Sequence, residues 1–97
     1  HIASIAKIQL QLLQTRLAKM DLEMQVSDAA LAELAKVGFD PVFGARPLKR
    51  AIQQRIENPL SKLLLQGHYP PKSVIPVDVD PVQEPGVFHF GQARQLA

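Results

Sequence analysis

Apolar residues recur at helical spacing from Leu48 to Leu64, and they keep this spacing across the pair Asn58-Pro59. Because residues four apart lie on one face of an α-helix, this run predicts an amphipathic helix. Pro47 suits its first turn, where a missing N–H costs no hydrogen bond. A proline inside a helix kinks or ends it, so two structures fit the run. One is a single kinked helix, and the other is a pair of helices with Asn58 as the second N-cap; the unbroken spacing favours nearly collinear axes.

The remaining apolar patterns predict one more long helix, one short helix and three short strands. Residues 2–20 carry an apolar stripe at helical spacing, and residues 28–37 follow Ser27, which can cap a helix N-terminus. We expect Gly38 to end that second helix. Alternation with a period of two predicts strands at residues 22–26, 75–79 and 87–90. The predicted fold class is therefore α+β, in the order α-β-α-α(α)-β-β, with a helical layer against a small three-stranded sheet.

Several local features qualify this outline. Pro76 lacks an N–H, so we expect it on a sheet edge or with its nitrogen turned outward. Phe39 and Phe43 are expected to pin the connector at residues 39–45 to the core. The domain is expected over residues 1–90, and residues 91–97 should fray. A second apolar stripe on the first helix either is buried in this domain or meets a surface outside it; its members are Ile5, Ile8 and Leu12.

Composition limits the class of protein. Of the 97 residues, 46% are hydrophobic and 21% charged, which is enough for one domain with a modest core. The lack of cysteine excludes a disulfide framework, a thiol nucleophile and a cysteine-based zinc site. No apolar run is long enough to cross a bilayer, and residues 1–4 lack the basic start of a signal peptide, so we expect a cytoplasmic location without a membrane partner. The first residue is not Met, which suggests a piece of a longer protein.

No arrangement of catalytic groups is visible in the sequence. There is no glycine-rich phosphate-binding loop of the P-loop or dinucleotide-binding type. The three histidines stand too far apart, and without partner carboxylates at ligand spacing, for a metal site. We therefore predict no catalytic residue and no metal ligand in this chain, which should catalyse nothing alone.

Basic residues gather near the start of the predicted 48–64 helix, with no acidic residue among them. They are Arg46, Lys49, Arg50 and Arg55. Gly44 and Ala45 have little side chain, so another surface can approach the backbone beside Arg46. The forked donors of a guanidinium suit phosphate oxygens. From the residues alone, this group is either a solvated helix face or an anion site, and a nucleic-acid-binding helix is one form of the second.

Residues 39–60 closely resemble the C-terminal small subdomain of the second AAA+ module of ClpB-type disaggregase chaperones. Their sequence is FDPVFGARPLKRAIQQRIENPL. The first ten residues resemble the first helix of the same subdomain, and the likeness extends over roughly residues 1–80. The Gly-Ala-Arg element is shared across Clp ATPases, whereas residues 56–60 are more similar to ClpB than to ClpA or ClpC. The segment from residue 81 to 97 carries no resemblance.

The resemblance implies roles for particular residues. Gly44, Ala45 and Arg46 would form the sensor-2 element, in which the arginine reaches the terminal phosphate of ATP held by the large subdomain of the same chain. Ile5 and Ile8 would help to close the adenine pocket. The contact with a neighbouring protomer of a homohexameric ring would include Lys49, Arg50 and Arg55.

The resemblance also implies the work of the parent protein, an AAA+ ATPase that threads unfolded or aggregated polypeptide through its ring. ATP or ADP with Mg²⁺ would bind to the parent, and none is expected on this chain alone, because the Walker motifs would precede His1. Two alternatives remain from the residues: a basic helical nucleic-acid-binding module, and a pure oligomerisation module without a nucleotide role. The formal charge of only +2 and the lack of stacking aromatics near the basic helix argue against nucleic acid as a partner.

Overall fold

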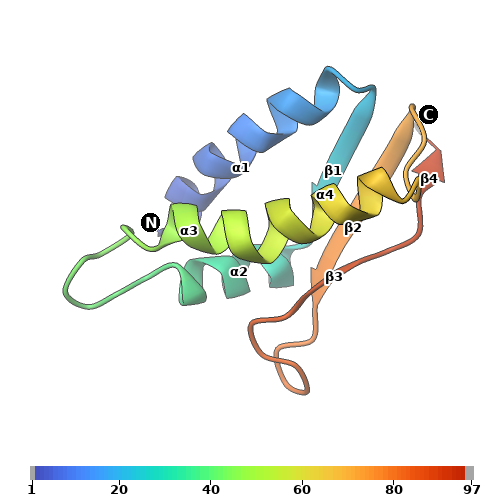
Figure 1. Ribbon diagram of the computed structural model, residues 1–97. Helices are drawn as coiled ribbons and strands as arrows, with labels where there is room; N and C mark the ends of the chain where they lie inside the picture. Colours follow the sequence, from blue (N-terminus) through green and yellow to red (C-terminus); the bar gives the residue numbers. More distant parts are fainter. Residues whose placement is uncertain (1, 96–97) are drawn as a thin grey trace.

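The computed structural model describes residues 2–95 and confirms the α+β fold class. Helix α1 (Ile2–Ala18), strand β1 (Leu22–Val26) and helix α2 (Asp28–Val37) come first. A continuous helical rod follows, made of α3 (Leu48–Ile52), the π-helical turn η1 (Gln53–Glu57) and α4 (Asn58–Leu65). Strands β2 (Ser73–Val79), β3 (Phe88–Phe90) and β4 (Arg94–Gln95) complete the fold. The helices gather on one side of the sheet (Figure 1).

Strand β2 is the centre of a mixed sheet. β1 pairs with one edge of β2 in parallel, and β3 and β4 pair with its other edge in antiparallel fashion. The prediction of three strands is one too few, because β4 forms inside the segment that was expected to fray. It does so because β2 begins two residues earlier than predicted, at Ser73, and there offers backbone groups that Gln95 and Arg94 pair with. Residues 96 and 97 of the predicted tail lie outside the described residues.

Pro76 lies inside the central strand rather than on an edge, which corrects the prediction. Its carbonyl accepts the N–H of Gly91 at 2.9 Å, so its nitrogen faces the same neighbouring segment, between β3 and β4. Because proline has no N–H, Pro76 cannot donate to the carbonyl of Gly91. The hydroxyl of Tyr69 donates to that carbonyl instead, at 2.5 Å. The register shifts by one residue between β3 and β4, as in a β-bulge. Burial raises the pKa of the Tyr69 hydroxyl.

One hydrophobic core lies between the helices and the sheet. Its most deeply buried large side chains are Leu34, Leu48, Ile56, Leu60, Ile75 and Val77. Ser27 caps α2 as predicted: its hydroxyl accepts the N–H of Ala30 at 3.0 Å and donates to Asp78 Oδ1 at 2.6 Å. The Ser27 hydroxyl and then the N–H of Val79 hold the pKa of Asp78 below its usual range. The first turn of α2 is thus tied to the central strand.

The helical rod continues through Pro59, as the unbroken apolar spacing favoured (Figure 1). Asn58 has helical dihedral angles (φ −64°, ψ −49°) and is not the N-cap of a separate helix. Its N–H bonds to the carbonyl of Gln53, five residues back, as in a π-helix. In a regular α-helix the ring of Pro59 would clash with the carbonyl of Arg55, four residues back. The wider turn at η1 relieves that clash, so the rod does not break.

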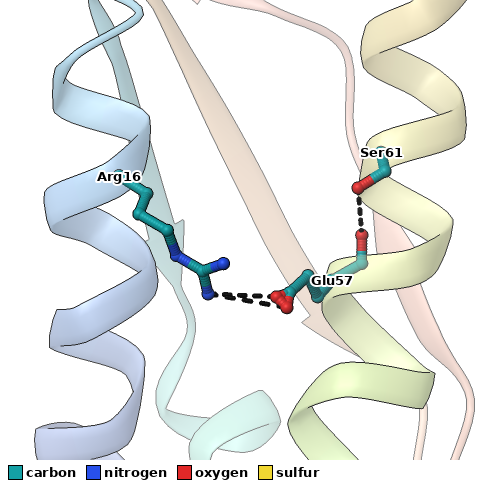
Figure 2. A network of polar contacts seen from close by, with 3 residues as sticks. All are labelled: Arg16, Glu57 and Ser61. Atoms are coloured by element: carbon teal, nitrogen blue, oxygen red, sulfur yellow. Dashed lines mark hydrogen bonds and ion pairs between the residues drawn. The ribbon is translucent and has the colours of Figure 1, made fainter.

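An ion pair ties the rod to α1. Figure 2 shows Arg16 of α1 reaching across to the carboxylate of Glu57 at the end of η1, with an N–O distance of 3.0 Å. The hydroxyl of Ser61, one turn further on, donates to the carbonyl of Glu57 at 2.9 Å. The Arg16 side chain is mostly exposed, so the pair contributes only about 0.2–1 kcal/mol. The position of α1 is therefore set mainly by its buried residues Ala6, Leu10, Leu13 and Leu17.

The loop between β2 and β3 is fastened at Gly86. The buried carboxylate of Glu33 in α2 accepts the N–H of Gly86 at 2.6 Å. The guanidinium of Arg55 in η1 donates to the carbonyl of the same residue. Gly86 has a φ of +78°, which favours glycine, and an added Cβ would lie 2.8 Å from Arg55 Nη1 and push the guanidinium aside. The loop therefore bridges α2 and the rod.

Candidate functional site

The predicted element Gly44 to Arg46 lies on a tight loop just before α3. Asp40 closes this loop: its backbone N–H and C=O each bond to Gly44 at 2.7 Å, and its carboxylate accepts the N–H groups of Val42 and Phe43 at 2.7 and 2.9 Å. Gly44 has a φ of +64°, which favours glycine, and an added Cβ would meet no atom within 4 Å. The loop is thus held by its own hydrogen bonds and leaves open space at Gly44, where a second surface can approach.

The aromatic residues of this loop do not pin it to the core, contrary to the prediction. Phe39 and Phe43 are 53% and 55% exposed, and Val42 is 80% exposed. Asp40 instead fixes the shape of the loop through hydrogen bonds within it. An aspartate followed by proline is a recognised turn signal, because its side chain bonds to backbone N–H groups two and three residues on. That signal in Asp40-Pro41 was available in the sequence.

Arg46 is exposed, and its guanidinium lies over the ring of Phe43, with Cζ 4.8 Å from the ring centroid. It forms no ion pair with any of residues 2–95. Its backbone N–H bonds to the carbonyl of Phe43 at 3.2 Å, and the carbonyl of half-buried Ala45 accepts the N–H of Leu48 at 3.0 Å, where the rod begins. The positive charge therefore stands uncompensated at the entrance to the longest rigid element.

The other three residues of the basic cluster differ in their surroundings. Lys49 and Arg50 are exposed on α3. Lys49 lines a groove between α1 and the rod, together with Leu12 and Ile52. Arg55 is committed to the carbonyl of Gly86 within the chain. A common role at an interface stays a prediction for the three residues, and Arg55 has an internal partner that the sequence pattern did not indicate.

The predicted adenine-pocket residues differ in burial. Ile5 packs partly against the core, whereas Ile8 is 64% exposed. Leu12, one turn further on, is 59% exposed. The second stripe of α1 is therefore half-buried at its start, and its remainder faces outward. α1 contacts α3, so its first turns lie beside the start of the rod, at the end of the molecule that carries Arg46 (Figure 1).

The described chain offers few other polar groups in reactive arrangements. Ser27 donates to Asp78 rather than to a histidine, and His89 pairs with Glu84 at 3.1 Å on the exposed side of the sheet. Among residues 2–95, no three His, Cys, Asp or Glu side chains lie close enough together to hold a metal ion. No helix in the same range combines the length and the hydropathy needed to cross a bilayer.

Comparison with known proteins identifies the family. A family model for the C-terminal, D2-small domain of ClpB protein matches residues 1–77. The Chaperone protein ClpB of Vibrio cholerae is 58% identical over 79 residues, and that of Dichelobacter nodosus is 50% identical over 80 residues. These alignments cover 81% and 82% of this chain, which spans about 9% of the length of the curated relatives it matches. The resemblance seen in residues 39–60 is thereby confirmed, and the chain belongs to the family of C-terminal D2-small domains of ClpB chaperone proteins.

Proposed function

We propose that this chain is the small lid subdomain of an ATP-dependent, protein-disaggregating chaperone, and that Arg46 senses the terminal phosphate of ATP. Membership of the ClpB D2-small family supports the chaperone context. One observation carries the sensing role: Arg46 is exposed, has no ion-pair partner in residues 2–95, and follows a loop that Asp40 holds in one shape. A charge placed this way is available to a phosphate bound by the large subdomain of the same parent protein.

Arg46 can distinguish ATP from ADP because only ATP carries the terminal phosphate. A ligand shifts a conformational equilibrium only by the difference in its contacts with the two states. One charge-assisted hydrogen bond contributes about 1.5–3 kcal/mol, which corresponds to a roughly ten- to hundredfold shift. ATP with Mg²⁺, bound to the parent protein, would supply the phosphate charge, and the guanidinium of this chain supplies the forked donors.

The rod connects the contact at Arg46 to the rest of the subdomain. It begins two residues after Arg46 and is locked into the core through Leu48, Ile56 and Leu60, each at most 1% exposed. Because protein cores are close-packed, a displacement at the start of the rod moves the packed elements together. We infer that the contact with phosphate is converted into rotation of the whole subdomain, which a homohexameric ring would use to thread aggregated protein.

The outward-facing apolar residues of α1 support contacts with other parts of the parent protein. Ile8 and Leu12 are more than half exposed, although large aliphatic side chains favour burial. We propose that the large subdomain covers the first turns of α1 near the adenine pocket. Lys49, which lines the groove between α1 and the rod, and Arg50, which is exposed on α3, would meet a neighbouring protomer. The proposed location is the cytoplasm.

The test is Arg46→Ala in a full-length ClpB-type chaperone that carries this domain. We expect ATP hydrolysis or nucleotide-dependent assembly to fall about tenfold or more, from the loss of one charge-assisted contact. Arg46→Lys should rescue poorly because an ammonium lacks the planar fork. Lys62→Ala, which removes an exposed charge from α4, is the matched control. ATPase rates and assembly of Arg46→Ala equal to those of the control would contradict the sensing role.

A further inference from the structure

We propose that Phe43 is a positioning residue for Arg46: its ring holds the guanidinium in the orientation from which it meets an anion. The inference deepens the proposed function and rests on it. Phe43 is 55% exposed, so the core does not account for a phenylalanine at this position. Its ring instead lies under the Arg46 side chain, with the centroid 4.8 Å from Cζ. This separation is within the range of about 6 Å over which a cation is attracted to a ring face.

The backbone that carries the ring is held by hydrogen bonds within the loop. The N–H of Phe43 bonds to the carboxylate of Asp40 at 2.9 Å, and the carbonyl of Phe43 accepts the N–H of Arg46 at 3.2 Å. Gly44, the next residue, is bonded at both its N–H and its C=O to Asp40. The backbone on both sides of the ring is therefore fixed within one turn. That turn places residues 43 and 46 next to each other, which is why the two side chains can stack.

A phenyl ring is well suited to orient an arginine without disabling it. A carboxylate in this place would neutralise the charge and occupy the N–H donors. An aromatic ring attracts the positive charge of the guanidinium but offers no oxygen acceptor, so it does not occupy the N–H donors as a carboxylate would. The positive charge and the forked donor edge both stay available to phosphate oxygens. Stacking on Phe43 thus keeps Arg46 ready for an anion.

The expected effect follows from the conformational freedom of the side chain. A long arginine loses rotamer freedom when it binds, and stacking removes part of that freedom before the anion arrives. An exposed contact of this kind corresponds to roughly a two- to fivefold change in affinity, and the effect grows when the contact is shielded from water. We therefore expect the KM for ATP to rise about two- to fivefold when the ring is removed.

The experiment compares three variants of this loop. Phe43→Leu removes the ring and keeps apolar bulk, whereas Phe43→Tyr retains the stacking face. Val42→Ala, at an 80% exposed neighbour, is the matched control. The first measurement needs no nucleotide: NMR relaxation of the Arg46 side-chain Nε–H in the 97-residue chain. The order parameter should fall in Phe43→Leu and remain at the wild-type value in Phe43→Tyr and Val42→Ala. Equal urea midpoints of all variants would show that the fold is intact.

The second measurement is ATP hydrolysis by the full-length chaperone, with the same variants in wild-type and Arg46→Ala backgrounds. Phe43→Leu should raise the KM for ATP in the wild-type background and have no additional effect once Arg46 is alanine. If Arg46→Ala impairs hydrolysis but Phe43→Leu matches Val42→Ala in both measurements, the positioning role is wrong and the sensing role stands. An equal effect of Phe43→Leu in both backgrounds also overturns the positioning role. If Arg46→Ala itself is silent, the proposed function fails first.

Discussion

Gly38 is required for packing rather than for an unusual backbone conformation. The sequence predicted a glycine stop at the end of α2, and the helix does end there, but the φ of Gly38 is −90°, which other residues also adopt. The demand for glycine comes from the rod. An added Cβ would lie 2.5 Å from Leu48 Cδ1 and 2.9 Å from Leu48 Cα. Leu48 is 1% exposed and is therefore closely packed on all sides.

Gly38→Ala should therefore destabilise the fold by about 1–3 kcal/mol, the usual cost of an extra methyl group in a packed core. Urea unfolding of the 97-residue chain measures this cost. Lys36→Ala, an exposed change in the same helix, is the control and should remain within about 0.5 kcal/mol of wild type. A cost for Gly38→Ala no larger than that of Lys36→Ala would show that the rod can shift to accept a Cβ.

Residue-level predictions were right where the chemistry is local. Ser27 was identified as a cap because a helix N-terminus needs a side-chain acceptor within three residues, and that is what it supplies. The burial of Phe39 and Phe43 was predicted wrongly, because exposure depends on where distant elements lie. The stacking of Arg46 on Phe43 needed the turn geometry as well as the residue types.

At the scale of elements, the π turn had a signal in the sequence that the simple helical interpretation missed. Leu48, Ile52, Ile56 and Leu60 repeat at intervals of four, and all are at most 7% exposed. With 3.6 residues per turn, a regular α-helix would place Leu60 about 120° around the helix axis from Leu48, so the buried face would be wide. The wider turn at η1 reduces that angle. The spacing of four and the position of Pro59 both indicate one extra residue in a helical turn, which is what η1 contains.

The arrangement around Pro76 could not be predicted, because its compensating donor comes from outside the strands. Tyr69→Phe removes the hydroxyl that bonds to Gly91 and should cost about 1–2 kcal/mol. Amide exchange in β3 and β4 should accelerate, since both strands flank that bond. In a Pro76→Val background the new N–H can bond to Gly91, so Tyr69→Phe should cost less there. Equal costs in the two backgrounds, measured by urea unfolding, would mean that Tyr69 does not replace the missing donor.

At the scale of the whole molecule, the domain extends beyond the part that the family model matches. The match to the family model ends at residue 77, whereas β3 and β4 lie later in the chain and pair with the central strand. Phe88 of β3 is 8% exposed and belongs to the core. Gly86 is the partner of the buried carboxylate of Glu33. The C-terminal segment is thus part of the domain, and the predicted boundary at residue 90 falls between two strands.

A chain cut after Asp80 should therefore lose much of its stability. The cut removes the buried Phe88 side chain, a loss of about 3–5 kcal/mol, and with Gly86 it removes the residue that bonds to both Glu33 and Arg55. Because natural domains are stable by only about 5–15 kcal/mol, the melting temperature should drop sharply or the transition should disappear. A chain that ends at Gln95, the last described residue, is the control. Equal melting temperatures of the chains ending at Asp80 and Gln95 would show that residues 81–95 do not contribute to the stability of the domain.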